Sequence, residues 1–128
     1  MGQQQLLLIV LGVIVVGIAI AAGMGLFSSN KVTSIKDELV NQNLAIGAVA
    51  QQYYSKPTSM GGGNQSFLNF GLAAAPLGKM AFTTNGTYAA GTGDANGIVI
   101  TATPRANLNY TWTATTHVQP DTMWTTIQ

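Results

Sequence analysis

The stretch LLLIVLGVIVVGIAIAAGMGLF, residues 6–27, contains no polar or charged side chain. At about 1.5 Å rise per residue, a helix over this stretch is roughly 33 Å long, and the hydrocarbon core of a bilayer measures ~30 Å. The first charged side chain in the sequence is Lys31, so residues 1–30 carry no charge beyond the α-amino group. We therefore expect residues 1–30 to form an apolar helix that inserts into a membrane.

Two other kinds of N-terminal segment fit parts of this pattern. A cleaved secretory signal begins with basic residues and has a shorter apolar run, but Ala19-Ile20-Ala21 resembles a cleavage site. A single-pass anchor normally carries basic residues next to its cytoplasmic end. Here Gln3, Gln4 and Gln5 precede the apolar run, as if an orienting leader had already been removed. Both alternatives stay open on the sequence.

A second stretch, after the apolar run, is amphipathic. Its apolar residues recur at steps of three, four, seven, three and four: Val32, Ile35, Leu39, Ile46, Val49 and Tyr53. This spacing places them on one face of a helix. Ser34 followed by Asp37 resembles a capping box and permits a fresh helix start, whereas Pro57 ends the helix by residue 55 or 56. The pattern predicts a helix over residues 1–55, either continuous or hinged.

Beyond Pro57 the pattern becomes typical of strands and turns. The clearest strand is predicted at residues 108–118, where the following apolar side chains share one face: Leu108, Tyr110, Trp112, Ala114 and Val118. A second strand is expected at residues 97–103. A third is expected at residues 80–89, interrupted or turned at Asn85-Gly86. Residues 122–127 predict a short last strand more weakly.

These elements together predict an α+β fold. The β-rich head at residues 56–128 is too small to bury a large core by itself. The apolar face of the amphipathic half-helix supplies the missing partner. We therefore expect the N-terminal helix, residues 1–55, to pack through its second half on a small C-terminal antiparallel sheet.

The composition excludes several kinds of chemistry. The chain has 128 residues, enough for one domain, with five Lys and Arg, four Asp and Glu, and no Cys. Without Cys, the chain has no disulfides, zinc–thiolate sites, iron–sulfur clusters or covalently attached haem. A net charge of +1 gives no electrostatic reason to expect nucleic-acid binding. We expect no cofactor and no metal.

Few residues are equipped for catalysis. His117 falls on the polar face of a predicted strand and is expected at the surface. Asp94-Ala95-Asn96-Gly97 resembles the beginning of a calcium loop, but no acidic residue follows at the required spacing, so a tight turn is expected. Asp37 and Glu38 are adjacent on a helix and hence lie on different parts of its surface. We expect the protein not to be an enzyme.

Three Asn-X-Ser/Thr sequences mark candidate glycosylation sites, at Asn64, Asn85 and Asn109. Such short motifs also arise by chance in a Thr-rich chain. The threonines of the head offer further hydroxyls for O-linked sugar. Any sugar is therefore expected on the head rather than on the apolar helix.

The arrangement of these elements resembles that of type IV pilins over the whole chain, and the sequence resembles theirs over residues 1–30. The stretch Gln3-Gln4-Gln5-Leu6-Leu7-Leu8-Ile9-Val10 is similar to the beginning of mature pilins, in which a few residues precede a Leu/Ile/Val run. The resemblance implies the major subunit of an extracellular filament, or fimbrium, that is stored in the inner membrane before assembly. It also implies leader removal by a prepilin peptidase, methylation of the new N-terminus, here Met1, and a pilus assembly machinery.

Two features depart from the pilin pattern. In pilins, a glutamate at the fifth mature position contacts the N-terminal amine of a neighbouring subunit, and Gln5 stands there if Met1 is the mature start. An amide accepts a hydrogen bond from the ammonium but offers no charge pair. If Gln3 is the first residue instead, Leu7 occupies the fifth position. The chain also lacks the C-terminal disulfide loop of many bacterial pilins.

The resemblance places the subunit contacts of a helical homo-oligomer along the apolar helix. We expect them at Gln5, Leu6, Leu7, Leu8, Gly12, Gly17 and Gly23. Small residues let helices approach closely, although they are common in any membrane helix and also weaken a helix locally. Such a filament would support adhesion, motility or surface contact. The alternative is a membrane-anchored minor pseudopilin or a single-pass accessory or receptor domain.

Overall fold

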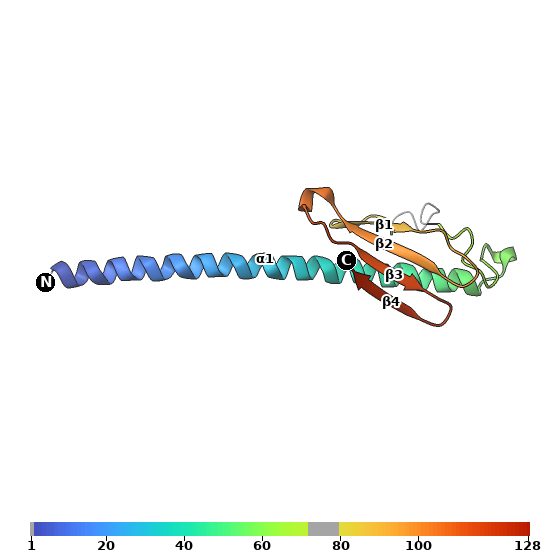
Figure 1. Cartoon of the computed structure of the whole chain (residues 1–128), viewed down its shortest axis with the longest axis horizontal. Coiled ribbons are helices and arrows are strands. Elements are labelled where there is room, and N and C mark those ends of the chain that lie inside the picture. The colour runs from blue at the N-terminus through green and yellow to red at the C-terminus, as the bar shows by residue number, and fades with distance from the viewer. Residues whose placement is uncertain (1, 72–79) are drawn as a thin grey trace. The chain divides into compact units, whose positions relative to one another are not determined.

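A computed structural model describes residues 2–71 and 80–128. Its first element, α1 (Gly2–Ser55), is one continuous α-helix (Figure 1). The helix passes through Ser34 and Asp37 without interruption, so of the two forms that the sequence allowed, continuous or hinged, it adopts the continuous one. The predicted end at residue 55 is confirmed, two residues before Pro57. Contacts divide the chain into two compact units, Met1–Ser34 and Ile35–Gln128.

The second unit contains an antiparallel sheet whose strands follow one another in chain order. Within the described residues it has four strands, β1 (Gly86–Ala90), β2 (Ile98–Pro104), β3 (Ala114–Val118) and β4 (Met123–Ile127). Short 3-10 helices, η1 (Thr58–Met60) and η3 (Ala106–Leu108), lie in the connections. The α+β fold predicted from the sequence, with the helix packed on a small antiparallel sheet, is confirmed.

Two strands are shorter than predicted. The strand expected at residues 108–118 is formed only as β3, because Leu108 ends η3 and Asn109 adopts the left-handed conformation, with φ of 57°. The third expected strand, residues 80–89, is turned near Asn85-Gly86 as predicted; its second part forms β1, and its first part contributes only an isolated antiparallel bridge between Phe82 and Thr87. Before β1, the backbone N–H of Thr83 donates to the carbonyl of Gly86 at 3.0 Å and closes a turn around Asn85. The strands expected at residues 97–103 and 122–127 are confirmed within one residue as β2 and β4.

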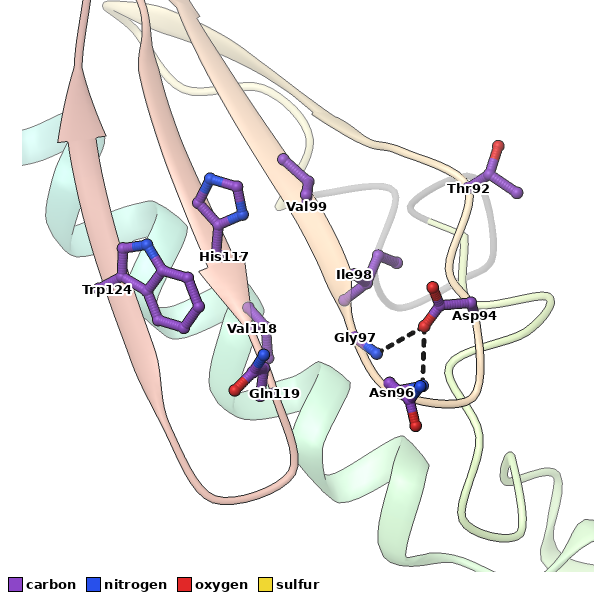
Figure 2. A pocket seen from close by; sticks show the side chains of 10 residues that line it. All are labelled: Thr92, Asp94, Asn96, Gly97, Ile98, Val99, His117, Val118, Gln119 and Trp124. Carbon is purple, nitrogen blue, oxygen red and sulfur yellow. Dashed lines mark hydrogen bonds between the residues drawn. The ribbon is translucent and has the colours of Figure 1, made fainter.

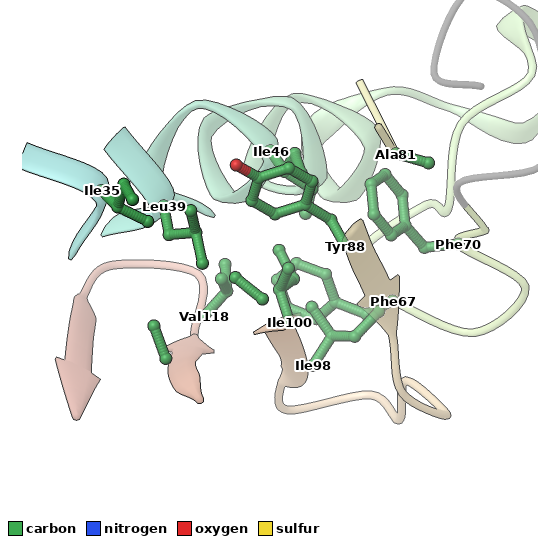
Figure 3. Close-up of a cluster of buried hydrophobic side chains, with 13 residues drawn as sticks. Ile35, Leu39, Ile46, Phe67, Phe70, Ala81, Tyr88, Ile98, Ile100 and Val118 are labelled. Atoms are coloured by element: carbon green, nitrogen blue, oxygen red, sulfur yellow. The ribbon is translucent and has the colours of Figure 1, made fainter. Parts of the chain in front are cut away.

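The core lies between the second half of α1 and the inner face of the sheet (Figure 3). From the predicted apolar stripe, Ile35, Leu39 and Ile46 are buried, whereas Val32, Val49 and Tyr53 are half-buried. Opposite them lie the alternate residues of β2 and β3 that face inward: Ile98, Ile100, Ala102, Ala114, Thr116 and Val118. Gly47 leaves room for side chains of the sheet, because an added Cβ would lie 2.5 Å from Sδ of Met123 and 3.0 Å from Cγ2 of Val118.

Tyr88 of β1 is the buried titratable group of this core. Its hydroxyl lies 3.2 Å from Oγ1 of Thr83. Burial raises the pKa of Tyr88 above its ordinary value of 10.0; the hydrogen bond to Thr83 opposes this rise, and the nearby charge of Glu38 adds to it. The folded state therefore resists ionisation of this phenol.

We expect alkaline pH to destabilise the wild-type protein more steeply than a Tyr88→Phe variant. Because the folded-state pKa is raised, the contribution of the phenol is intact below the unfolded-state pKa and is lost as pH rises through the folded-state pKa. The loss proceeds at up to about 1.4 kcal/mol per pH unit. Urea unfolding in detergent, compared at about pH 8 and about pH 11, measures the difference. The expectation would be contradicted if, above pH 10, the free energy of unfolding fell equally steeply with pH in both proteins.

Candidate functional site

The most unusual surface of the molecule is the apolar first half of α1. Every large apolar side chain from Leu6 to Phe27 is between 53% and 77% exposed. Monomeric soluble proteins rarely expose a contiguous apolar patch larger than a few hundred Å². This segment therefore requires an apolar partner, either lipid or protein.

The length and composition of α1 allow both kinds of partner. It is the one helix in the described part of the chain that is long and apolar enough to cross a membrane. Residues 6–27 lie inside α1, beyond its first turn, so their backbone N–H and C=O groups pair within the helix and only side chains meet the surrounding hydrocarbon or protein. The segment from Leu6 to Phe27 is thus the candidate functional site, and we call it the apolar segment.

The predicted contact residues all lie on this exposed helix. Gln5, Leu6, Leu7 and Leu8 are exposed near its beginning, whereas Met1 lies outside the described residues. Gly12, Gly17 and Gly23 have open space around them, because a Cβ added to any of them would meet no atom within 4 Å. Among residues 2–71 and 80–128, these glycines therefore have no packing partner.

Three small residues are ordered along the helix together with Gln5. Gln5, Gly12, Ala19 and Gly23 follow one another at steps of seven, seven and four, which places them along one side of α1. Gly17 lies on a different side, five residues after Gly12. A helix with small residues along one side presents a shallow groove to a neighbouring helix.

The three candidate glycosylation sites differ in access. Asn64 and Asn109 are exposed, and both have positive φ, 50° and 57°. Asn85 is half-buried, and its Nδ2 donates to Oε2 of Glu38 on α1. A sugar on Asn85 would have to displace this hydrogen bond, so Asn64 and Asn109 are the more accessible of the three.

A shallow depression on the outer side of the sheet collects most of the other polar groups singled out in the sequence (Figure 2). Oδ1 of Asp94 accepts the backbone N–H groups of Asn96 and Gly97 at 2.7 and 2.8 Å, so this segment forms the predicted tight turn. His117 stacks on Trp124, with ring centroids 5.1 Å apart. In residues 2–71 and 80–128, no cluster of three or more His, Asp or Glu side chains lies close enough to hold a metal ion.

Three features of the structure differ from or add to what the sequence patterns predict. Asn43 is fully buried, Lys36 lies over the ring of Trp112 at 5.4 Å, and β4 forms an edge of the sheet. The burial of Asn43 could have been predicted, because the residue lies on the apolar stripe, four residues after Leu39 and three before Ile46. The other two depend on which strands pair, and the local pattern does not contain that information.

The apolar segment remains the strongest candidate site, since its exposure is continuous and nothing in the described part of the chain covers it. No family model, curated protein or solved structure matches this chain. The likeness to type IV pilins rests on the residues quoted from the N-terminal stretch and on the order of the elements.

Proposed function

We propose that this protein is the structural subunit of an extracellular type IV pilus-like filament, polymerising through its apolar segment. The observation that carries the proposal is the continuous exposure of large apolar side chains from Leu6 to Phe27 on a helix whose second half belongs to a folded head. The proposed role is structural. Adhesion, motility or surface contact would follow from the filament.

The physical chemistry of the apolar segment suits two environments in succession. Lipid and the core of a fibre both exclude water, so transfer between them changes the hydrophobic free energy little. The helix keeps its backbone hydrogen bonds in both places. The subunit is therefore stored in the inner membrane as a monomer and is later packed against copies of itself by an assembly machinery.

The small residues provide the close approach that such packing needs. Gly12, Ala19 and Gly23 lie along one side of α1 together with Gln5. In the proposed filament, the amide of Gln5 accepts a hydrogen bond from the methylated N-terminal amine of a neighbouring Met1. An amide at this place costs less to bury than a carboxylate, because it needs only hydrogen bonds and no counter-charge.

Cryo-electron microscopy of filaments sheared from the source cells tests the proposal, together with the intact mass of the dissociated subunit. We expect helical fibres whose density fits this chain, and a mass spectrum of the dissociated subunit in which the residue at the mature N-terminus carries one added methyl group. A chain that stays in the membrane fraction, with no fibre containing it, would instead support an anchored minor pseudopilin or a single-pass accessory domain. A fibre whose core does not contain residues 6–27 would also overturn the proposal.

A further inference from the structure

The outer edge of β4 carries unpaired backbone groups. Thr113 and Gln128 exchange both backbone hydrogen bonds, at 2.7 and 2.9 Å, and Gln119 N–H donates to the carbonyl of Thr122. In an antiparallel ladder, hydrogen-bonded and non-hydrogen-bonded pairs alternate. The register of β3 with β4 therefore turns the N–H and C=O groups of Met123, Thr125 and Ile127 away from β3. Among the described residues, no strand pairs with this edge (Figure 1).

This edge lacks the features that usually protect an edge strand from pairing. Proteins place Lys, Pro, a bulge or an inward-pointing charge on such strands. The segment from Thr122 to Gln128 contains no charged residue and no Pro, and its pairing with β3 is regular throughout. In addition, Trp124 is 45% exposed and Ile127 is 44% exposed. The edge is thus both open in its hydrogen bonding and apolar at its surface.

We propose that β4 pairs with β4 of a second copy of this chain, antiparallel and centred on Thr125, so that two heads share one continuous sheet. In this register Thr125 lies opposite Thr125 of the partner, and Met123 lies opposite Ile127. The N–H and C=O groups of Met123, Thr125 and Ile127 then face the same groups of Ile127, Thr125 and Met123 in the second copy. Each of these pairs exchanges two hydrogen bonds.

The side chains agree with this register on both faces of the sheet. On the inner face, Met123 meets Ile127 of the second copy, on either side of the central Thr125 pair. On the outer face, Trp124 meets Thr126 of the second copy. Apolar residues thus meet apolar residues, an aromatic residue meets a β-branched one, and no like charges are opposed. The exposed surfaces of Trp124 and Ile127 are covered in the same step.

The symmetry of this contact gives it a role separate from polymerisation. Antiparallel pairing of a strand with itself has a two-fold axis, whereas the screw that builds a polar helical filament generates head-to-tail contacts. The β4 contact therefore joins heads of two different filaments, or two subunits that have not polymerised. It goes beyond the proposed function and does not require it, because the contact lies wholly within the head.

A single-cysteine scan of the full-length chain tests the register, and the natural absence of Cys makes each introduced thiol unique. Opposed residues in a hydrogen-bonded antiparallel pair have Cα atoms about 5.5 Å apart, within the range that a disulfide bridges. We expect the Thr125→Cys chain, purified in detergent and mildly oxidised, to form a covalent dimer. The neighbouring Thr126→Cys chain is the matched control, and it should crosslink to itself at least about fivefold less because Trp124 lies opposite it. A mixture of Met123→Cys and Ile127→Cys chains should crosslink better than either alone.

Equal crosslinking of the Thr125→Cys and Thr126→Cys chains would overturn the proposal, since it would indicate collision within one micelle rather than a fixed register. Absence of the Thr125→Cys dimer, with the far-ultraviolet circular dichroism of the wild type retained, would also overturn it.

A charge-swap experiment does not depend on disulfide geometry. Thr125→Lys places two ammonium groups opposite each other, and Thr125→Glu places two carboxylates there. Each variant alone should lower the dimer fraction in sedimentation velocity by about tenfold, and the mixture of the two should restore it. Dimer fractions that do not differ between each variant and the mixture would contradict pairing at residue 125.

The same variants separate this inference from the proposed function. We expect Thr125→Lys filaments to form singly, without side-by-side association, if the chain polymerises. Filaments that still associate laterally would refute the β4 contact and leave the filament proposal intact. If no filaments form at all, the crosslinking and sedimentation results on solubilised chains still decide whether β4 pairs with itself.

Discussion

Chains that carry Gly12→Leu together with Gly23→Leu are expected to remain in the membrane but to form no filaments. Within one chain these substitutions are harmless, because a Cβ at either position meets no atom within 4 Å. Leu is also the better helix former, by nearly 1 kcal/mol at each position. In the proposed filament the same substitutions hinder assembly, because the new side chains must fit between neighbouring helices on the side of α1 that also carries Ala19.

The size of the effect follows from overpacking. Inserting large side chains into a packed interface costs about 1–3 kcal/mol at each site, and each 1.4 kcal/mol changes an association constant by a factor of ten. The double variant should therefore raise the concentration needed for assembly by about 30-fold or more. Negative-stain electron microscopy of sheared material, normalised to the amount of chain in the membrane fraction, measures this change.

A matched control adds little volume to the same helix. The Val13→Leu and Val15→Leu double variant retains an apolar segment and should assemble like the wild type. If the glycine variant also assembled normally, close helix packing along the Gly12–Gly23 side would be excluded. A single-pass anchor, in contrast, would form no fibres with either variant, so the two would not differ in this assembly assay.

The helix was the most predictable part of the structure. The run of residues 6–27 and the stripe that begins near Ile35 are long patterns, and a helix satisfies them almost independently of what packs against it. Pro57 set its end within two residues. Its continuity through Ser34 was not decided by the sequence, because a capping motif competes with the uninterrupted helical hydrogen bonds of both flanking stretches.

The strands were predicted less well because their ends depend on single residues. The alternation through Tyr110 and Trp112 is compatible with a strand, but the left-handed turn at Asn109 breaks it, and the two rings stack on each other instead, 5.9 Å apart. Asn tolerates this conformation better than most residues, so the signal was present but not decisive. The open edge of β4 was beyond the local pattern, since strand order is a property of the whole sheet.

Replacing Asn43 by Asp should destabilise the head more than any other nearly isosteric change in its core. Asn43 is fully buried, and its Nδ2 donates to the carbonyl of Ala114 at 3.1 Å, while its Oδ1 has no hydrogen-bond partner among the described residues. The carboxylate of Asn43→Asp would lose the donor and leave an unpaired charge in the core. An uncompensated buried charge costs about 3–5 kcal/mol, and we expect a loss of stability of this size at neutral pH.

The pH dependence of this loss distinguishes charge from shape. Burial should raise the pKa of the introduced carboxyl above its unfolded value of about 3.9, so the penalty is absent below that pH and grows as pH rises toward the folded-state pKa. Its slope is at most about 1.4 kcal/mol per pH unit. Urea unfolding in detergent, followed by the fluorescence of Trp112 and Trp124, gives the free energy of unfolding at each pH.

Asn43→Leu is the control, because its side chain has the same branching and the same number of heavy atoms and carries no charge, although it is the larger of the two. It gives up the bond to Ala114 but also removes the unpartnered Oδ1, so its stability should lie within about 1.5 kcal/mol of the wild type and should not change with pH relative to it. If the Asn43→Asp chain behaved like this control at neutral pH, water would have to reach the site. Leu39, Ile46 and Ala114, which surround this site, are all fully buried in the structure. Such an outcome would therefore mean that α1 packs more loosely on β3 than the structure shows.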